Sequence, residues 1–193
     1  MSDSLDVLAI VGSLRRESYT RRLAQALAHV APPSLAVEIA GVGDLPLYNE
    51  DEESTVAAWA AFRARAKRAD AILFATPEYN RTIPGGLKNA IDVGSRPYGQ
   101  SVWAGKPAAV ISTSPGAMGA FGANHQLRQA LVFLDMPTMQ QPEAYLGGVD
   151  HMFDARGQFV EERTRNYCAH FMQSFEQWIR RQLVTADPQV RRA

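Results

Sequence analysis

The stretch Val7-Leu8-Ala9-Ile10-Val11-Gly12-Ser13-Leu14-Arg15 decides the fold. Its five leading apolar residues are typical of a short parallel strand buried on both faces, and the glycine and serine that follow end the run in a turn. Apolar residues then recur at helical spacing from Leu23 to Val30, and the proline pair at 32–33 prevents the helix from continuing. The pattern predicts a buried strand, a polar loop and a helix, in that order.

The same alternation of apolar runs and helical patterns continues along the chain. Further strands are predicted at residues 35–39, 71–76 and 108–113, with a short fifth strand beginning at residues 138–140. Helices are predicted at residues 56–67, 84–93, 124–134 and 161–183, before a frayed tail at residues 185–193. Alternating strands and helices favour a parallel sheet with right-handed crossovers and helices on both faces. No linker divides the sequence, so we expect one α/β domain over residues 1–193.

Composition and charge exclude several classes of function. The 193 residues include 20 basic and 20 acidic side chains, whereas a nucleic-acid partner would favour an excess of Lys and Arg. The sequence shows no apolar run long enough to span a membrane and no signal-peptide pattern, so we expect a cytoplasmic protein without a membrane partner. The single cysteine, Cys168, lies in a helical apolar stripe and is expected to pack in the core.

The loop after the first strand carries the residue types that bind phosphate. Hydroxyls, a guanidinium and the free amides of a helix N-terminus bind phosphate without a glycine-rich turn, and this loop offers Ser13, Arg15, Ser18 and Thr20. It has neither the dinucleotide-binding Gly-x-Gly-x-x-Gly pattern nor a Walker A motif, which disfavours a tightly bound dinucleotide. Taken alone, the loop is equally consistent with an N-capping serine beside a surface arginine.

Two more loops follow strands that should end at the same edge of the sheet, where doubly wound sheets bind their ligands. The segment Pro77-Glu78-Tyr79-Asn80 offers a rigid wall and an aromatic face, which suit a flat ring system. The segment from Ser114 to Gly116 combines a hydroxyl with a glycine that permits close backbone approach. Each of these loops is also explained by an ordinary turn.

Together the three loops resemble the NAD(P)H-dependent FMN reductases, and among them the chromate/quinone reductase branch. The resemblance extends over residues 7–148 and depends on segments that occur in the same order along the chain. These segments are Gly12-Ser13-Leu14-Arg15-x-x-Ser18, Thr76-Pro77-Glu78-Tyr79-Asn80, Pro84-Gly85-x-Leu87-Lys88-Asn89-Ala90-Ile91-Asp92, Ser114-Pro115-Gly116 and Gln126-Leu127-Arg128. The resemblance implies a flavodoxin-like three-layer α/β/α sandwich with a five-stranded parallel sheet in the order 2-1-3-4-5.

The resemblance also implies which residues bind the cofactor. The implied phosphate-binding residues are Ser13, Arg15, Ser18 and Thr20, the last standing where the family usually has Asn. The residues implied around the isoalloxazine ring are Pro77, Glu78, Tyr79, Asn80, Ser114 and Gly116. We expect no catalytic side chain and no metal site, because in such enzymes FMN itself carries the hydride chemistry.

The expected activity is that of an FMN-dependent NAD(P)H oxidoreductase. Hydride is expected to pass from NADPH or NADH to N5 of FMN and then to a small acceptor such as a quinone, chromate or free flavin, by a ping-pong mechanism. The alternative is a flavodoxin-like electron carrier or flavin-binding module without substantial reductase activity. Hydrolysis is disfavoured because the chain has no Gly-x-Ser-x-Gly elbow.

Partners and specificity are less determined by the sequence. The resemblance implies a homodimer or homotetramer, and the apolar stretch at residues 131–139 suits either an interface or the core. Arg81 and Arg96 are candidates for attracting the phosphates of NAD(P)H, with plain solvated arginines as the alternative. The physiological acceptor and the preference between NADH and NADPH stay open.

Overall fold

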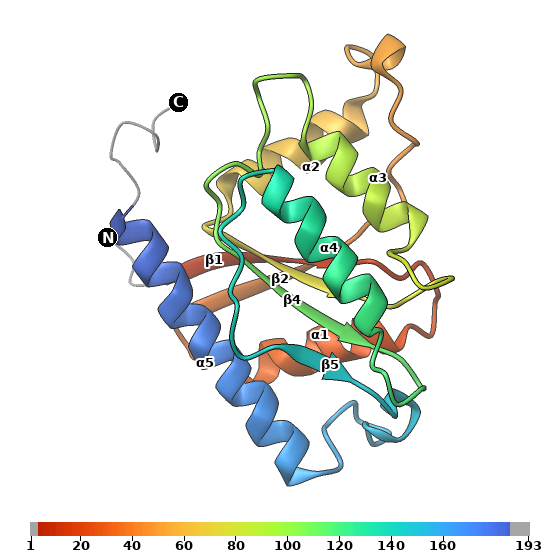
Figure 1. The fold of residues 1–193 in the computed structure, drawn as a ribbon, viewed down its shortest axis with the longest axis vertical. Helices are drawn as coiled ribbons and strands as arrows, with labels where there is room; N and C mark the ends of the chain where they lie inside the picture. Colours follow the sequence, from red (N-terminus) through yellow and green to blue (C-terminus); the bar gives the residue numbers. More distant parts are fainter. Residues whose placement is uncertain (1–3, 186–193) are drawn as a thin grey trace.

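A parallel five-stranded sheet forms the centre of the computed structural model, which describes residues 4–185 (Figure 1). Its order is β2-β1-β3-β4-β5, and every neighbouring pair is parallel. The strands are β1 (Leu5–Val11), β2 (Leu35–Gly41), β3 (Ala71–Thr76), β4 (Ala108–Thr113) and β5 (Ala144–Leu146). The predicted flavodoxin-like sheet order is therefore confirmed.

Helices cover both faces of this sheet, and side chains of β1 alternate between the two layers. Figure 1 shows α4 in front of the sheet and α1 behind it. Val7 and Ala9 pack with residues of α1 (Tyr19–Val30) and α5 (Glu162–Thr185). Leu8 and Ile10 pack with residues of α2 (Ala57–Arg68), α3 (Gly85–Gly94) and α4 (Phe121–Phe133). Two short 3-10 helices lie at Glu50–Glu52 and Val149–His151.

Cys168 lies in the core layer between α5 and the sheet, as predicted. It is fully buried, among residues that include Phe171 and Met172. Burial disfavours the charged thiolate and raises the pKa of its thiol to about 12. A thiol that stays protonated at neutral pH is a poor nucleophile, so Cys168 contributes packing rather than chemistry.

The fifth strand was predicted at the wrong place. Thr138 forms only an isolated bridge with Ala108, at the start of β4, whereas β5 comes later and pairs with the last residues of β4. Prolines at 137 and 142 flank the predicted segment, and a proline has no amide hydrogen to give to a strand ladder. The edge strand is therefore interrupted and resumes only at Ala144.

The predicted helix at 124–134 begins three residues earlier, at Phe121. No polar residue caps this helix from the preceding chain, because Ala120 occupies the N-cap position with φ 61°. The cap comes instead from Glu78, whose Oε2 accepts a hydrogen bond from the amide of Ala123 at 3.0 Å. A cap supplied from a distant loop leaves no local signal in the sequence.

The helices α2, α3 and α5 agree with the prediction at their ends to within one or two residues, whereas α1 begins at Tyr19, four residues before the predicted apolar spacing. Thr185 is the last residue of α5, and the rest of the predicted tail at 186–193 lies outside the described residues. Among residues 4–185, none of the helices has both the length and the apolar character needed to cross a bilayer.

Candidate functional site at the carboxyl edge of the sheet

The loops after β1 and β3 lie against each other at the carboxyl edge of the sheet. The amide of Gly12 donates to the carbonyl of Ala75 at 2.9 Å, and a Cβ at Gly12 would lie 3.4 Å from Cδ of Pro77. Leu14 packs over the start of α3, since a Cβ at Gly86 would lie 3.5 Å from its side chain. The small residue at position 12 thus allows the first two predicted loops to form one surface.

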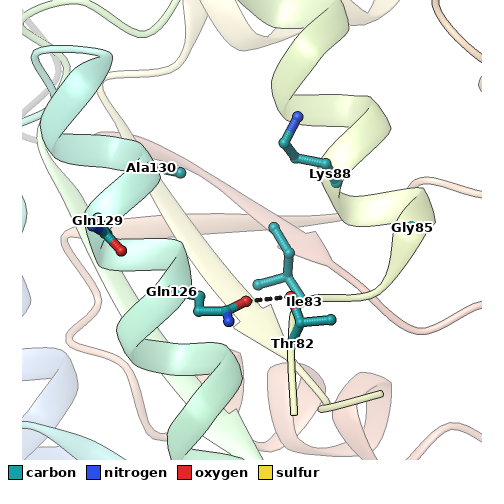
Figure 2. Close-up of a pocket in the computed structure, with 7 residues that line it drawn as sticks. All are labelled: Thr82, Ile83, Gly85, Lys88, Gln126, Gln129 and Ala130. Atoms are coloured by element: carbon teal, nitrogen blue, oxygen red, sulfur yellow. Dashed lines mark hydrogen bonds between the residues drawn. The ribbon is translucent and has the colours of Figure 1, made fainter. Parts of the chain in front are cut away.

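The loops after β3 and β4 are joined through the first turn of α4. Glu78 accepts from the amide of Ala123, and the hydroxyl of Thr82 bonds to Oε1 of Gln126, the contact drawn in Figure 2. A Cβ at Gly122 would lie 3.0 Å from the carbonyl oxygen of Arg81, so the glycine allows the second loop to approach α4 closely. Three loops that are distant in sequence therefore make one continuous rim.

The first loop presents its phosphate-binding groups at the start of α1. Ser18 is the N-cap, and its Oγ accepts from the amide of Arg21 at 3.1 Å; Oγ of Ser13 accepts from the amide of Arg15 at 3.4 Å. Each hydroxyl is an acceptor in these bonds, so its hydrogen is left to donate. The amide of Arg21 is used by Ser18, so the amides of Tyr19 and Thr20 at the start of α1 are the further donors.

Two other predicted residues of this loop differ in their exposure. Arg15 is exposed, and its guanidinium carbon lies 5.7 Å from the centre of the Tyr19 ring. Thr20 is buried in the first turn of α1. An exposed cation beside helix amides favours a bound anion, and a buried Thr20 is less accessible to such an anion than Arg15 is.

All three loops expose a large apolar side chain at the rim. Leu14 of the first loop is 62% exposed, Tyr79 of the second 50% and Met118 of the third 60%. Pro77 is half-buried beside Gly12 of the first loop. Oγ of Ser114 donates to the carbonyl of Gly116 at 3.0 Å, which holds the third loop in shape. Exposed apolar groups gathered on one rim mark a ligand site, and a flat ring would cover them.

The same three loops lie within the part of the sequence that matches a known protein family. Residues 5–150 match the family described as NADPH-dependent FMN reductase. The chain belongs to this family. It is accordingly an NAD(P)H-dependent flavin oxidoreductase that uses FMN and NAD(P)H, which confirms the predicted class of enzyme and its cofactors.

Individual members of the family cover almost the whole chain. A quinone reductase of Pseudomonas putida is 57% identical over 182 residues, with 93% of this chain and 97% of the relative covered. A 2-hydroxy-1,4-benzoquinone reductase of Burkholderia sp. is 46% identical over 178 residues, covering 92% and 97%. The solved structure of FerB, a flavoenzyme NAD(P)H:(acceptor) oxidoreductase from Paracoccus denitrificans, has a TM-score of 0.88 at 39% identity and covers 92% and 98%.

The residues at the rim of this FMN reductase fit the cofactor. The first loop supplies hydroxyl and helix-amide donors together with an exposed arginine, and these groups suit the terminal phosphate. The apolar side chains of the three loops suit the isoalloxazine ring. All ten sequence-predicted residues lie on the three loops or in the turn of α1 that follows the first loop.

Two features of the second loop were missed by sequence reasoning. Glu78, predicted beside the ring, also caps α4 through the bond to Ala123. The segment Tyr79–Thr82 closes on itself with two backbone bonds of 3.0 and 2.9 Å, and its central residues, Asn80 and Arg81, have φ of 50° and 65°. Both values are those of a type I′ turn, whose usual sequence signal is a glycine in the second central position. Asn80 supplies the first half of the usual Asn-Gly signal, but Arg81 occupies the glycine position.

A groove of about 530 Å³ extends from this turn between α3 and α4 (Figure 2). The residues that line this α3–α4 groove are Thr82, Ile83, Gly85, Lys88, Gln126, Gln129 and Ala130. On the other side of α3, a hollow of about 400 Å³ reaches Tyr48 and Arg96. Lys88 borders both spaces and forms an ion pair of 2.7 Å with Asp92. Both spaces beside the second loop therefore offer polar side chains to a ligand other than FMN.

An aromatic cluster flanks the third loop. Phe121, His125 and Tyr145 lie with ring centres 4.2 to 5.7 Å apart, and Nε2 of His125 is 3.0 Å from the hydroxyl of Tyr145. Partial burial is the main cause that raises the pKa of Tyr145 to about 12, and the nearby carboxylate of Glu143 is the second cause. Tyr145 therefore stays neutral throughout the physiological range.

Proposed function

We propose that this enzyme reduces quinones. The main structural support is the apolar rim, to which three different loops contribute an exposed side chain: Leu14, Tyr79 and Met118. A quinone is a flat, largely apolar ring, so it would stack on the isoalloxazine ring that this rim surrounds, and the apolar surroundings suit it better than they suit a compact anion. The proposal is supported by relatives named quinone reductase and 2-hydroxy-1,4-benzoquinone reductase at 57% and 46% identity.

In this proposal the protein binds and orients, and FMN when bound supplies the hydride-transfer chemistry. The residues proposed to hold the phosphate are Ser13, Arg15 and Ser18, with Thr20 contributing from the first turn of α1. The residues proposed to line the ring are Pro77, Glu78, Tyr79, Asn80, Ser114 and Gly116. Because the Glu78 carboxylate is held by Ala123, it fixes the position of its loop.

We also propose ping-pong kinetics. The three loops form one continuous rim, so a nicotinamide ring and a quinone ring would occupy the same surface in turn. Initial rates measured over a grid of NADPH and quinone concentrations should then give parallel double-reciprocal lines. Intersecting lines would show a ternary complex and contradict this part of the proposal.

The proposed function is tested by visible absorption of the purified protein loaded with FMN under anaerobic conditions. We expect NADPH or NADH to bleach the flavin band and a benzoquinone to restore it within the time of one turnover. The first donor to act also reveals the donor preference. Retention of FMN with very slow bleaching by both donors would favour the electron-carrier alternative, and failure to bind FMN would reject both.

We further propose a homodimer or homotetramer. The predicted apolar stretch at 131–139 divides into two sets: Leu131, Met136 and Met139 are buried, whereas Val132 and Phe133 are 75% and 88% exposed. Adjacent exposed apolar side chains suit a subunit contact. Light scattering after size exclusion should give twice or four times the chain mass, and Phe133→Glu should lower it. A cytoplasmic location is also proposed, because a free buried cysteine suits a reducing compartment.

A further inference from the structure

Arg81 adopts a backbone conformation that side chains rarely occupy. Its φ is 65°, in the second central position of the Tyr79–Thr82 turn, where a type I′ turn usually has glycine. A left-handed conformation is strained for any residue with a Cβ, and arginine has no short side chain to bond locally as asparagine does. Strain of this kind is common at functional sites, where the surrounding structure holds it in place.

The surrounding structure does fix this turn on three sides. Before the turn, Glu78 bonds to the amide of Ala123 at 3.0 Å. After the turn, Thr82 bonds to Gln126 on the next turn of α4. At Arg81 itself, the carbonyl oxygen faces Gly122, where a Cβ would come within 3.0 Å. The turn therefore holds the arginine backbone in one place at the start of α4.

The guanidinium of Arg81 is directed to solvent and is only loosely paired. Its side chain is 83% exposed, and its nearest carboxylate oxygen, Oε1 of Glu78, lies 3.7 Å away, beyond hydrogen-bond range. The other oxygen of Glu78 is already bonded to Ala123. Among residues 4–185, no hydrogen bond from the Arg81 side chain is found, so its N–H groups remain available to a ligand.

The α3–α4 groove begins at the residue after Arg81. Its volume of about 530 Å³ is of the size that holds a small-molecule ligand, and its walls carry amide, hydroxyl and ammonium groups. The first loop, with Arg15 and the α1 amides, already accounts for the FMN phosphate in the proposed function. A second anion site beside the second loop is therefore available to the other phosphate-bearing molecule of the reaction.

We propose that Arg81 binds a phosphate group of NAD(P)H, with the rest of the dinucleotide directed into the α3–α4 groove. This inference depends on the proposed function, in which NAD(P)H meets the rim formed by the three loops. The planar fork of arginine matches a phosphate, and the fixed turn holds the Arg81 backbone next to Thr82, which lines the groove. Arg81 is thus a residue that determines donor affinity and takes no part in acceptor binding.

The test compares Arg81→Ala, Arg81→Gly and Arg81→Lys with the matched control Arg163→Ala, which removes an exposed arginine from the start of α5. Calorimetry on the FMN-loaded proteins measures the Kd of NADP+ and of NAD+. Stopped-flow absorption measures the anaerobic rate with each reduced donor. We expect the Ala and Gly variants to bind roughly tenfold more weakly and the Lys variant to lose only part of this affinity.

A second readout separates binding from folding. Because glycine accepts φ 65° without strain, Arg81→Gly should melt no lower than the parent while Arg81→Ala retains the strain. Weaker binding with unchanged or higher melting temperature therefore cannot come from partial unfolding. KM for the quinone should be the same in all variants.

The outcomes are distinct. A loss confined to NADP+ identifies the 2′-phosphate as the ligand of Arg81, and an equal loss for NAD+ identifies the diphosphate. Unchanged affinity for both, or an equal rise in KM for the quinone, overturns the inference while the proposed function stands. If the parent protein itself is not reduced by either donor, the proposed function fails, and that result is visible before any variant is made.

Discussion

Glu78 shows how one side chain connects two loops of the site. Its carboxylate caps α4 through the amide of Ala123, 45 residues away in sequence, and lies 3.7 Å from Arg81. We expect Glu78→Ala to lower stability by about 1 kcal/mol, the usual effect of losing a helix cap. In a domain of this size, that corresponds to a fall of roughly 2–4 °C in melting temperature.

Glu78→Gln is the matched variant for this prediction. Glutamine keeps an oxygen that accepts from Ala123 but loses the attraction between a carboxylate and the positive end of the helix. Its melting temperature should therefore fall between those of the parent and Glu78→Ala. A melting temperature for Glu78→Ala equal to that of the parent would show that the cap contributes nothing.

Cys168 gives a pH dependence whose sign is fixed by its burial. Its pKa is raised from 9.0 to about 12, so the folded protein keeps a proton that the unfolded chain loses. The stabilisation is fully present below about pH 9 and is lost as pH rises toward about 12. Urea titrations between about pH 9 and 10 should show the free energy of unfolding falling by up to about 1.4 kcal/mol per pH unit.

The control for this effect is Cys168→Ala. Removal of the thiol creates a small cavity and lowers stability at every pH, so the slope with pH is compared rather than the absolute value. Tyrosines also begin to ionise in this range, and burial raises the pKa of Tyr145 to about 12, so only the difference in slope between the parent and Cys168→Ala belongs to the thiol. Equal slopes in parent and variant would mean that the buried thiol does not titrate as proposed.

Residue types in the three loops were readable from sequence, but their contacts were not. Ser13 and Ser18 were predicted from chemistry and position, and Ser18 does stand at the start of α1. A turn at Asn80 was readable, but the left-handed backbone of Arg81 was not, because the usual glycine is absent and the conformation depends on contacts with Gly122 and Gln126. Tertiary contacts, rather than local preference, decide such positions.

At the scale of elements, two of the three glycines in α3 differ in the space around them. A Cβ at Gly94 would lie 2.2 Å from the ring of Trp103, which is fully buried and donates its Nε1–H to the carbonyl of Ile91 at 2.9 Å. We expect Gly94→Ala to displace this ring and lower stability by about 1–3 kcal/mol or more, as overpacking does. Guanidinium chloride unfolding with tryptophan fluorescence measures both the loss and the change around the indole.

Gly85→Ala on the same helix is the matched control. A Cβ at Gly85 would meet nothing within 4 Å, and alanine favours a helix over glycine. We expect stability to be unchanged or raised by about 0.4–1 kcal/mol. If both variants lost the same amount, the effect would belong to the helix backbone and the contact with Trp103 would not be its cause.

The elements themselves were predictable where the periodicity is local. Buried runs such as residues 71–76 and 108–113 coincide with β3 and β4, because strands buried on both faces are apolar throughout. The fifth strand was misplaced because an edge strand needs little apolar patterning, and two prolines interrupt it. The start of α4 was missed because its cap is Glu78, which no window around Phe121 contains.

At the scale of the whole molecule, the parallel topology explains why distant residues form one site. Parallel strands β1, β3 and β4 all run in the same direction, so the loops that follow them must emerge at the same edge. The family match over residues 5–150 covers these three loops and all five strands, whereas α5 lies outside the match and packs with α1 on one face of the sheet. A cofactor that contacts all three loops should therefore raise the melting temperature of the whole domain.

This coupling predicts that FMN stabilises the fold more than riboflavin does. A ligand that binds only the folded state adds about 2.7 kcal/mol at a concentration of 100 Kd, which corresponds to a rise of roughly 5–10 °C in melting temperature here. Riboflavin has the ring but no phosphate, so it should raise the melting temperature less. Differential scanning fluorimetry with equal concentrations of the two flavins measures the difference, which is the contribution of the phosphate loop.

Arg15→Gln assigns that difference to the first loop. The variant removes the exposed charge beside the α1 amides while leaving the apolar rim unchanged, so the advantage of FMN over riboflavin should shrink. Arg163→Gln, which removes an exposed arginine from the start of α5, should retain the full advantage. If Arg15→Gln also retained it, the phosphate would be bound elsewhere on the rim, and the α3–α4 groove beside Arg81 would be the next place to look.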